Sequence, residues 1–117
     1  MGKDKILFLQ KPSCTTCRKG KAYLEKLGRE LESRNLDTQR LSEEELDKLI
    51  GERDYKLFLN PRNELYRTRK MKERPPTRAQ AIRMMAEQPN LIRRPVVIRG
   101  KRLVLGYDEQ AYRELVK

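Results

Sequence analysis

Histidine and tryptophan are absent from this sequence of 117 residues, and cysteine occurs only twice. Without histidine, the chain lacks the side chain that most often changes its protonation near neutral pH and that most often binds metals. Two cysteines cannot supply the four nitrogen or sulfur ligands that a structural zinc site normally uses. The sequence therefore predicts no metal centre, and we expect no cofactor.

Long hydrophobic runs are also absent, since no apolar stretch approaches the about 18 residues that span a bilayer. The N-terminus leads into only four consecutive apolar residues, from Ile6 to Leu9, which is too few for the central region of a secretory signal peptide. We therefore expect a cytoplasmic protein that does not enter a membrane. Thiols in that compartment stay reduced unless they are redox-active.

Aromatic residues are scarce and the charge is strongly unbalanced. Phe, Trp and Tyr make up 6% of the chain, so a platform for stacking nucleic-acid bases is poorly supplied. The net charge of +11 favours contact with anions, acidic protein surfaces or nucleic acid. No recognition motif accompanies the charge, so direct nucleic-acid binding ranks last. A basic surface without a partner remains an open alternative.

The pattern of apolar residues predicts one α/β domain over residues 1–117, because neither a linker nor a repeat interrupts it. Ile6–Leu9 is typical of a buried strand, and a helix from Arg18 to Leu27 follows, with Gly28 as its end. Leu31–Leu36 is a weaker candidate for a strand, because its alternation is imperfect.

The second half of the chain carries clearer boundaries. A helix with a capping box is expected after Ser42, and another after Thr77, ending before Pro89. The sequence pattern does not assign residues 52–76 to helices or strands. Strands at 95–98 and 103–105 form a hairpin through Gly100, and Asp108 caps a final helix. This order predicts a mixed sheet with helices on its faces.

Cys14 and Cys17 form a Cys-x-x-Cys motif between the first strand and the first helix. Backbone N–H groups at a helix start favour a negative charge, and Arg18 adds a positive charge one turn beyond Cys14. These features lower a thiol pKa and create a nucleophile, so we assign Cys14 as the attacking thiol and Cys17 as the resolving thiol. A pair of inert core cysteines and a coincidental spacing are the competing interpretations.

Several segments resemble the arsenate reductase/Spx family of thioredoxin-fold proteins, and the similarity runs nearly from end to end. The segments that carry it are Lys11–Lys19, Leu57–Arg62, Leu65–Arg69, Leu91–Ile98 and Lys101–Glu109.

This resemblance implies a thioredoxin-like sheet flanked by helices, with a helical insertion in the middle of the chain. It also implies that the Arg94–Pro95 peptide bond is cis and faces the dithiol. By position, Cys14 matches the catalytic cysteine and Arg18 belongs to the same catalytic element. Arg67 and Arg94 match arginines that bind an oxyanion, a task that suits the fixed charge and forked donors of guanidinium.

The sequence also departs from the glutaredoxin-coupled arsenate reductases. It has a second cysteine, Cys17, and Gly106–Asp108 stands where those enzymes have a further arginine. Two functions therefore stay open. One is a thiol oxidoreductase recycled by glutathione and glutaredoxin or by the thioredoxin system. The other is an Spx-like redox sensor that binds the RNA polymerase α subunit, with the basic 62–83 segment on an acidic partner surface.

Overall fold

The computed structural model describes residues 5–117. The prediction about a signal peptide rests in part on residues 1–4, which lie outside the described residues. The chain forms two compact units. One consists of the residues up to Gln39 together with Arg94–Lys117, and the other of Arg40–Arg93. The expectation of one domain over residues 1–117 stays a prediction.

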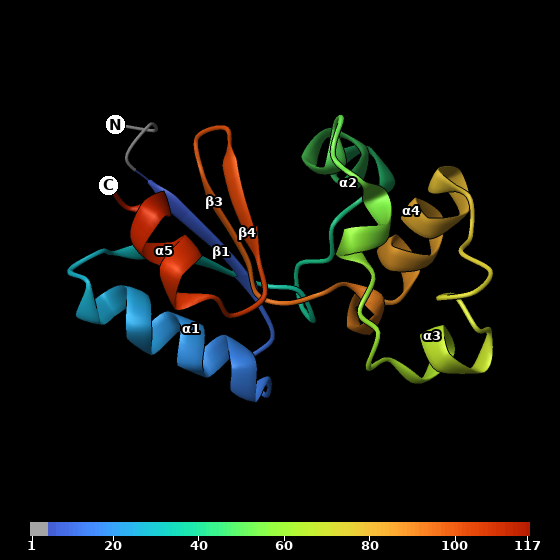
Figure 1. The fold of residues 1–117 in the computed structure, drawn as a ribbon, viewed down its shortest axis with the longest axis horizontal. Helices are drawn as coiled ribbons and strands as arrows, with labels where there is room; N and C mark the ends of the chain where they lie inside the picture. The colour runs from blue at the N-terminus through green and yellow to red at the C-terminus, as the bar shows by residue number, and fades with distance from the viewer. Residues whose placement is uncertain (1–4) are drawn as a thin grey trace. The chain divides into compact units, whose positions relative to one another are not determined.

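A mixed sheet organises the first unit (Figure 1). Its strands are β1 (Ile6–Gln10), β2 (Leu31–Asn35), β3 (Val96–Arg99) and β4 (Arg102–Leu105). Across residues 5–117 their spatial order is β2-β1-β3-β4. β1 pairs parallel to β2 and antiparallel to β3, and β3 pairs antiparallel to β4. Both the mixed sheet and the β3–β4 hairpin were predicted from the sequence, and both are confirmed.

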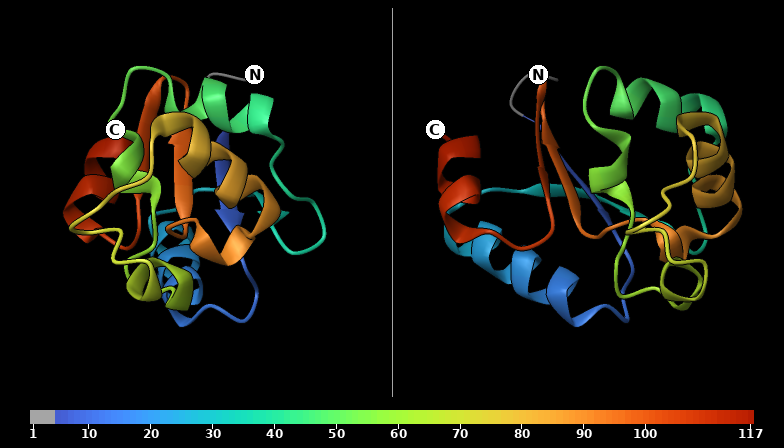
Figure 2. Two further views of the ribbon diagram at one scale, coloured as in Figure 1. Left: turned by 90° about the vertical axis from the view of Figure 1, so that its right-hand side faces the viewer. Right: turned by 45° about the vertical axis from the view of Figure 1, so that its right-hand side comes forward.

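Two helices, α1 (Thr15–Lys26) and α5 (Glu109–Leu115), lie side by side against the sheet (Figures 1 and 2). The core between them and the strands contains Phe8, Cys17 and Tyr112, all with no exposed surface. Asp108 caps α5 through its side chain, which accepts a hydrogen bond from the N–H of Ala111. The predicted cap is therefore confirmed.

The second unit is built from short helices. They are α2 (Glu43–Ile50), the 3₁₀ turn η2 (Tyr55–Phe58), α3 (Glu64–Thr68), α4 (Arg78–Glu87) and the 3₁₀ turn η3 (Pro89–Leu91). Capping boxes start α2 at Ser42 and α4 at Thr77, as the sequence predicted. Within residues 52–76, which had no assignment, lie η2 and α3. Both are too short to show a helical periodicity.

The strands β1, β3 and β4 differ from the predicted ranges by one residue at one or both ends, and α1 and β2 differ for reasons that the structure shows. Helix α1 begins at Thr15 rather than Arg18, because Cys14 itself serves as the N-cap. The weak second strand is real and ends at Asn35. Its alternation is poor because β2 lies at the edge of the sheet, where Glu32 and Ser33 are exposed. Among residues 5–117, no helix is long and apolar enough to cross a membrane.

Candidate functional site

Cys14 occupies the turn between β1 and α1. Its N–H donates to the carbonyl of Lys11 at 3.0 Å, and its backbone is extended, with φ of −81° and ψ of 117°. The Sγ atom of Cys14 accepts a hydrogen bond from the N–H of Cys17 at 3.3 Å. The thiol therefore takes the place of the hydroxyl or carboxylate oxygen that usually caps a helix, where negative charge is stabilised.

The pKa of Cys14 lies below its ordinary value. Partial burial of the side chain raises this pKa, but two other influences outweigh it. Hydrogen bonds from Cys17 stabilise the thiolate, and the guanidinium of Arg94 contributes both its charge and a hydrogen bond. Cys14 is only half-buried, so its sulfur combines an increased thiolate fraction with access from solvent.

Cys17 has the opposite character. Its side chain has no exposed surface and packs in the core with Phe8 and Leu24. Burial above all, together with the hydrogen bond and negative charge of Cys14, raises the pKa of Cys17 to about 12. Both cysteines are free thiols in this structure. The motif is therefore an asymmetric pair, with one accessible thiol of low pKa and one buried protonated thiol.

Arg94 is the basic residue that acts on this pair. It precedes β3 and joins Pro95 through a cis peptide bond, as the resemblance implied. Because β1 pairs with β3, the start of β3 lies at the sheet end from which the Cys14 turn emerges. The charge of Arg94 favours the thiolate of both cysteines.

Arg18, by contrast, is exposed, and its guanidinium donates to the hydroxyl of Thr15 at 3.4 Å. The charge that lowers the pKa of Cys14 comes from Arg94. Arg67 lies in the other unit, at the end of α3, with its side chain exposed. Its role in binding an anion stays a prediction.

Tyr112 supports the site in a way that the sequence did not reveal. Its buried hydroxyl donates to the carbonyl of Gly106. A Cβ atom on Gly20 would lie 2.9 Å from that hydroxyl oxygen and 3.4 Å from Cγ of Pro95. Gly20 therefore lets α1 approach both residues. The sequence offered one indication of this role: Tyr112 lies among the apolar positions of the last helix, and a buried tyrosine hydroxyl normally needs a hydrogen-bond partner.

In the part of the chain that the structure describes, no group of three or more Cys, Asp or Glu side chains is placed so that it could hold a metal ion. The groups at the Cys14 turn are the two thiols, the guanidinium of Arg94 and the N–H groups that begin α1.

Comparison with known proteins matches this arrangement to one family. The model of the ArsC family matches residues 9–115. The chain belongs to the ArsC family. Among its curated relatives, this ArsC-family member is 32% identical over 110 residues to the global transcriptional regulator Spx 2 of Lactococcus lactis, covering 92% of this chain and 83% of that one. It is 30% identical to the global transcriptional regulator Spx of Streptococcus agalactiae, covering 92% and 79%.

Solved structures agree on the fold of this ArsC-family member. An ArsC family related protein from Bacteroides fragilis has 29% identity and a TM-score of 0.83, with 95% of this chain and 98% of that chain covered. An arsenate reductase from Vibrio cholerae has 24% identity and a TM-score of 0.82, with 95% and 97% covered. The fold is the α/β thioredoxin-like fold that the resemblance implied.

Proposed function

We propose that this ArsC-family member is a thiol-disulfide redox protein in which Cys14 is the nucleophile and Cys17 the resolving thiol. The observation that carries the proposal is the hydrogen bond from the N–H of Cys17 to Sγ of Cys14 at 3.3 Å. It stabilises the thiolate at the start of α1 and keeps the second cysteine one helical turn away.

The proposed reaction reduces a disulfide by two electrons. The Cys14 thiolate attacks one sulfur of the substrate, forming a mixed disulfide and releasing the other sulfur as a thiolate that takes a proton from water. The Cys17 thiol then transfers its proton to water and attacks Sγ of Cys14, which breaks the mixed disulfide and releases the second substrate sulfur as a thiolate. The protein is left with a Cys14–Cys17 disulfide. Glutathione with glutaredoxin, or the thioredoxin system, returns two electrons and two protons.

Burial of Cys17 makes its protonation state differ between the two steps. With a pKa of about 12, Cys17 stays protonated while Cys14 attacks, so it does not compete for the substrate. Once Cys14 is in a mixed disulfide, its negative charge is gone, and that charge is one of the causes that raise the pKa of Cys17. The first step therefore makes the second easier.

The arginines have supporting roles in this proposal. Arg94 stabilises the thiolate of Cys14 and negative charge on the incoming substrate, and Pro95 shapes the wall beside the dithiol. Arg18 adds positive charge at the exposed start of α1, and Arg67 is proposed to bind an anionic part of the substrate. Because Gly106–Asp108 replaces a further arginine, we propose a disulfide rather than arsenate as the substrate class. A cytoplasmic location would provide the reductants.

Mass analysis during a redox titration, followed by turnover assays, tests the proposal. We expect the oxidised wild type to lose two hydrogens through a Cys14–Cys17 disulfide, and to consume reducing equivalents with a mixed glutathione disulfide as substrate. Cys14→Ser abolishes turnover, whereas Cys17→Ser stops at a trapped mixed disulfide on Cys14. Full turnover by Cys17→Ser with external thiol contradicts the resolving role, and turnover with arsenate contradicts the substrate class.

A redox-controlled regulator is the second candidate, favoured by the Spx relatives at 30–32% identity. In this proposal the same disulfide controls binding to the RNA polymerase α subunit. The test compares capture of purified α subunit by reduced and oxidised protein. Capture that depends on oxidation and disappears in Cys14→Ser, together with absent turnover, supports the regulator. Equal capture by both forms contradicts it.

A further inference from the structure

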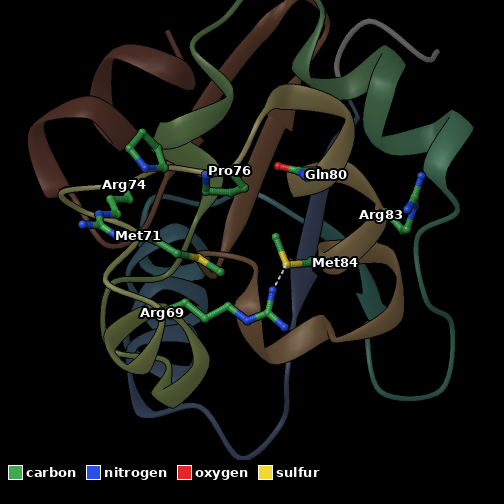
Figure 3. Close-up of a pocket in the computed structure, with 8 residues that line it drawn as sticks. Arg69, Met71, Arg74, Pro76, Gln80, Arg83 and Met84 are labelled. Carbon is green, nitrogen blue, oxygen red and sulfur yellow. Dashed lines mark hydrogen bonds between the residues drawn. The ribbon is translucent and has the colours of Figure 1, made fainter.

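A pocket of about 400 Å³ opens on the Arg40–Arg93 unit, and neither cysteine nor Arg94 lines it (Figure 3). Its lining comes from the segment that follows α3 and from α4. Arg69, Arg74 and Arg83 bring positive charge, while Met71 and Met84 bring apolar surface. Pockets of this size hold a few side chains or a small ligand.

The positive charge at this pocket is not neutralised within the protein. In residues 5–117, the guanidinium groups of Arg74 and Arg83 make no ion pair and no hydrogen bond. In Figure 3 these two residues lie at opposite ends of the group of side chains that line the pocket. Within the same described residues, the guanidinium of Arg69 donates only to Sδ of Met84, at 3.8 Å. A thioether is a weak acceptor, so a carboxylate would displace it readily.

The apolar part of the lining argues against a simple ion as the ligand. Met71 is 3% exposed and Met84 is half-buried, and Pro75 and Pro76 add further apolar surface. Methionine adapts its shape to different apolar partners. A free phosphate or sulfate would contact the arginines and leave this surface unused.

Nucleic acid fits the pocket less well than protein does. Its lining contains no aromatic side chain on which a base could stack. A peptide that carries an apolar side chain between carboxylates matches both components, since arginine pairs with carboxylates in a forked geometry.

We propose that this pocket binds a short acidic segment of a partner protein, with one apolar side chain between Met71 and Met84 and carboxylates on Arg74 and Arg83. The pocket uses neither cysteine, so this interaction goes beyond the redox chemistry of Cys14. It gives the basic 62–83 segment, with eight basic and two acidic residues, a defined ligand class.

The test uses a fluorescein-labelled decapeptide of glutamates with two central leucines, titrated into the reduced full-length protein at near-physiological salt. We expect saturable anisotropy and ¹³C-methyl NMR shifts at Met71 and Met84, with smaller changes at buried Met85. The double variant Arg74→Gln/Arg83→Gln weakens binding about tenfold, because two charge-assisted contacts at an exposed rim are lost.

The control variant Arg62→Gln/Arg93→Gln removes the same charge from exposed positions of the same unit outside the pocket. We expect it to weaken binding less than about threefold. Equal losses in the two double variants would overturn the proposal in favour of general charge attraction. So would a peptide with serines in place of the leucines binding as tightly, or a single-stranded oligonucleotide shifting the Met71 and Met84 methyl signals at lower concentration than the peptide.

Discussion

Cys14 and Arg94 form a pair whose coupling can be followed by titration. The alkylation rate of a thiol follows its thiolate fraction, so a lowered pKa moves the rise of the rate to lower pH. Arg94→Gln removes a positive charge that stabilises the Cys14 thiolate. We expect the pKa to rise and the rate at pH 7 to fall. The measurement is iodoacetamide labelling of the reduced protein across pH, with mass analysis of the Cys14 peptide.

Arg18→Gln is the matched control, because it removes the same charge near the motif. Its side chain bonds to Thr15 rather than to the thiol, so the rise in rate should stay at nearly the same pH. A shift as large as that of Arg94→Gln would contradict our assignment. Buried Cys17 should remain unlabelled at neutral pH in every folded variant, since its pKa is about 12.

The difference between these two arginines also shows what a sequence can reveal at this scale. Cys14, Cys17 and Arg18 are local, and their spacing predicted a thiol at a helix start. Arg94 is 80 positions from Cys14 along the chain, and its action depends on the pairing of β1 with β3. Only the resemblance to a family identified it. The burial of Cys17 likewise depends on α5, which packs beside α1.

At the scale of elements, the contact of α1 with α5 depends on Gly20. Helix propensity alone favours Gly20→Ala by about 1 kcal/mol. The added methyl group, however, would meet the hydroxyl of Tyr112 at 2.9 Å, and that hydroxyl is buried and bonded to Gly106. Overpacking of this kind costs ~1–3 kcal/mol, so we expect a net loss of stability. Urea denaturation of the reduced protein measures it.

Two further variants separate the steric cause from helix propensity. Tyr112→Phe removes the oxygen that the methyl group would meet, so Gly20→Ala should cost less in that background. Ala22→Gly changes an exposed position of the same helix and should lose about 1 kcal/mol by propensity. Stabilisation by Gly20→Ala, mirroring Ala22→Gly, would contradict the close approach of α1 to Tyr112.

Elements with strong local signals were predictable, and those set by tertiary contacts were not. Ser42 and Thr77 identified α2 and α4 because a capping box is encoded within four residues. The start of α1 was placed three residues late, because cysteine is not among the usual capping residues. Leu59, the residue that follows η2, forms a bridge to Ile92, a contact that no local pattern contains.

At the scale of the whole molecule, positive charge exceeds what the protein's own carboxylates can balance. The chain has 28 basic and 17 acidic residues, and the ion pairs within residues 5–117 involve mostly exposed side chains. Exposed pairs contribute little to stability, typically below about 1 kcal/mol. Repulsion among the excess positive side chains therefore destabilises the folded state. Among the contributions to the free energy of folding, it is the one that dissolved salt changes most.

Salt should consequently stabilise this protein. At an ionic strength of about 0.1 M the Debye length is about 10 Å, so repulsion across the molecule is screened while close pairs lose less. We expect the thermal midpoint of the reduced protein to rise between about 20 and 500 mM sodium chloride, by about 4 °C for each 1 kcal/mol of repulsion removed. Arg62→Gln/Arg93→Gln, which lowers the net charge, should show a smaller rise. A midpoint that falls with salt would mean that the ion pairs stabilise the fold more than the excess charge destabilises it.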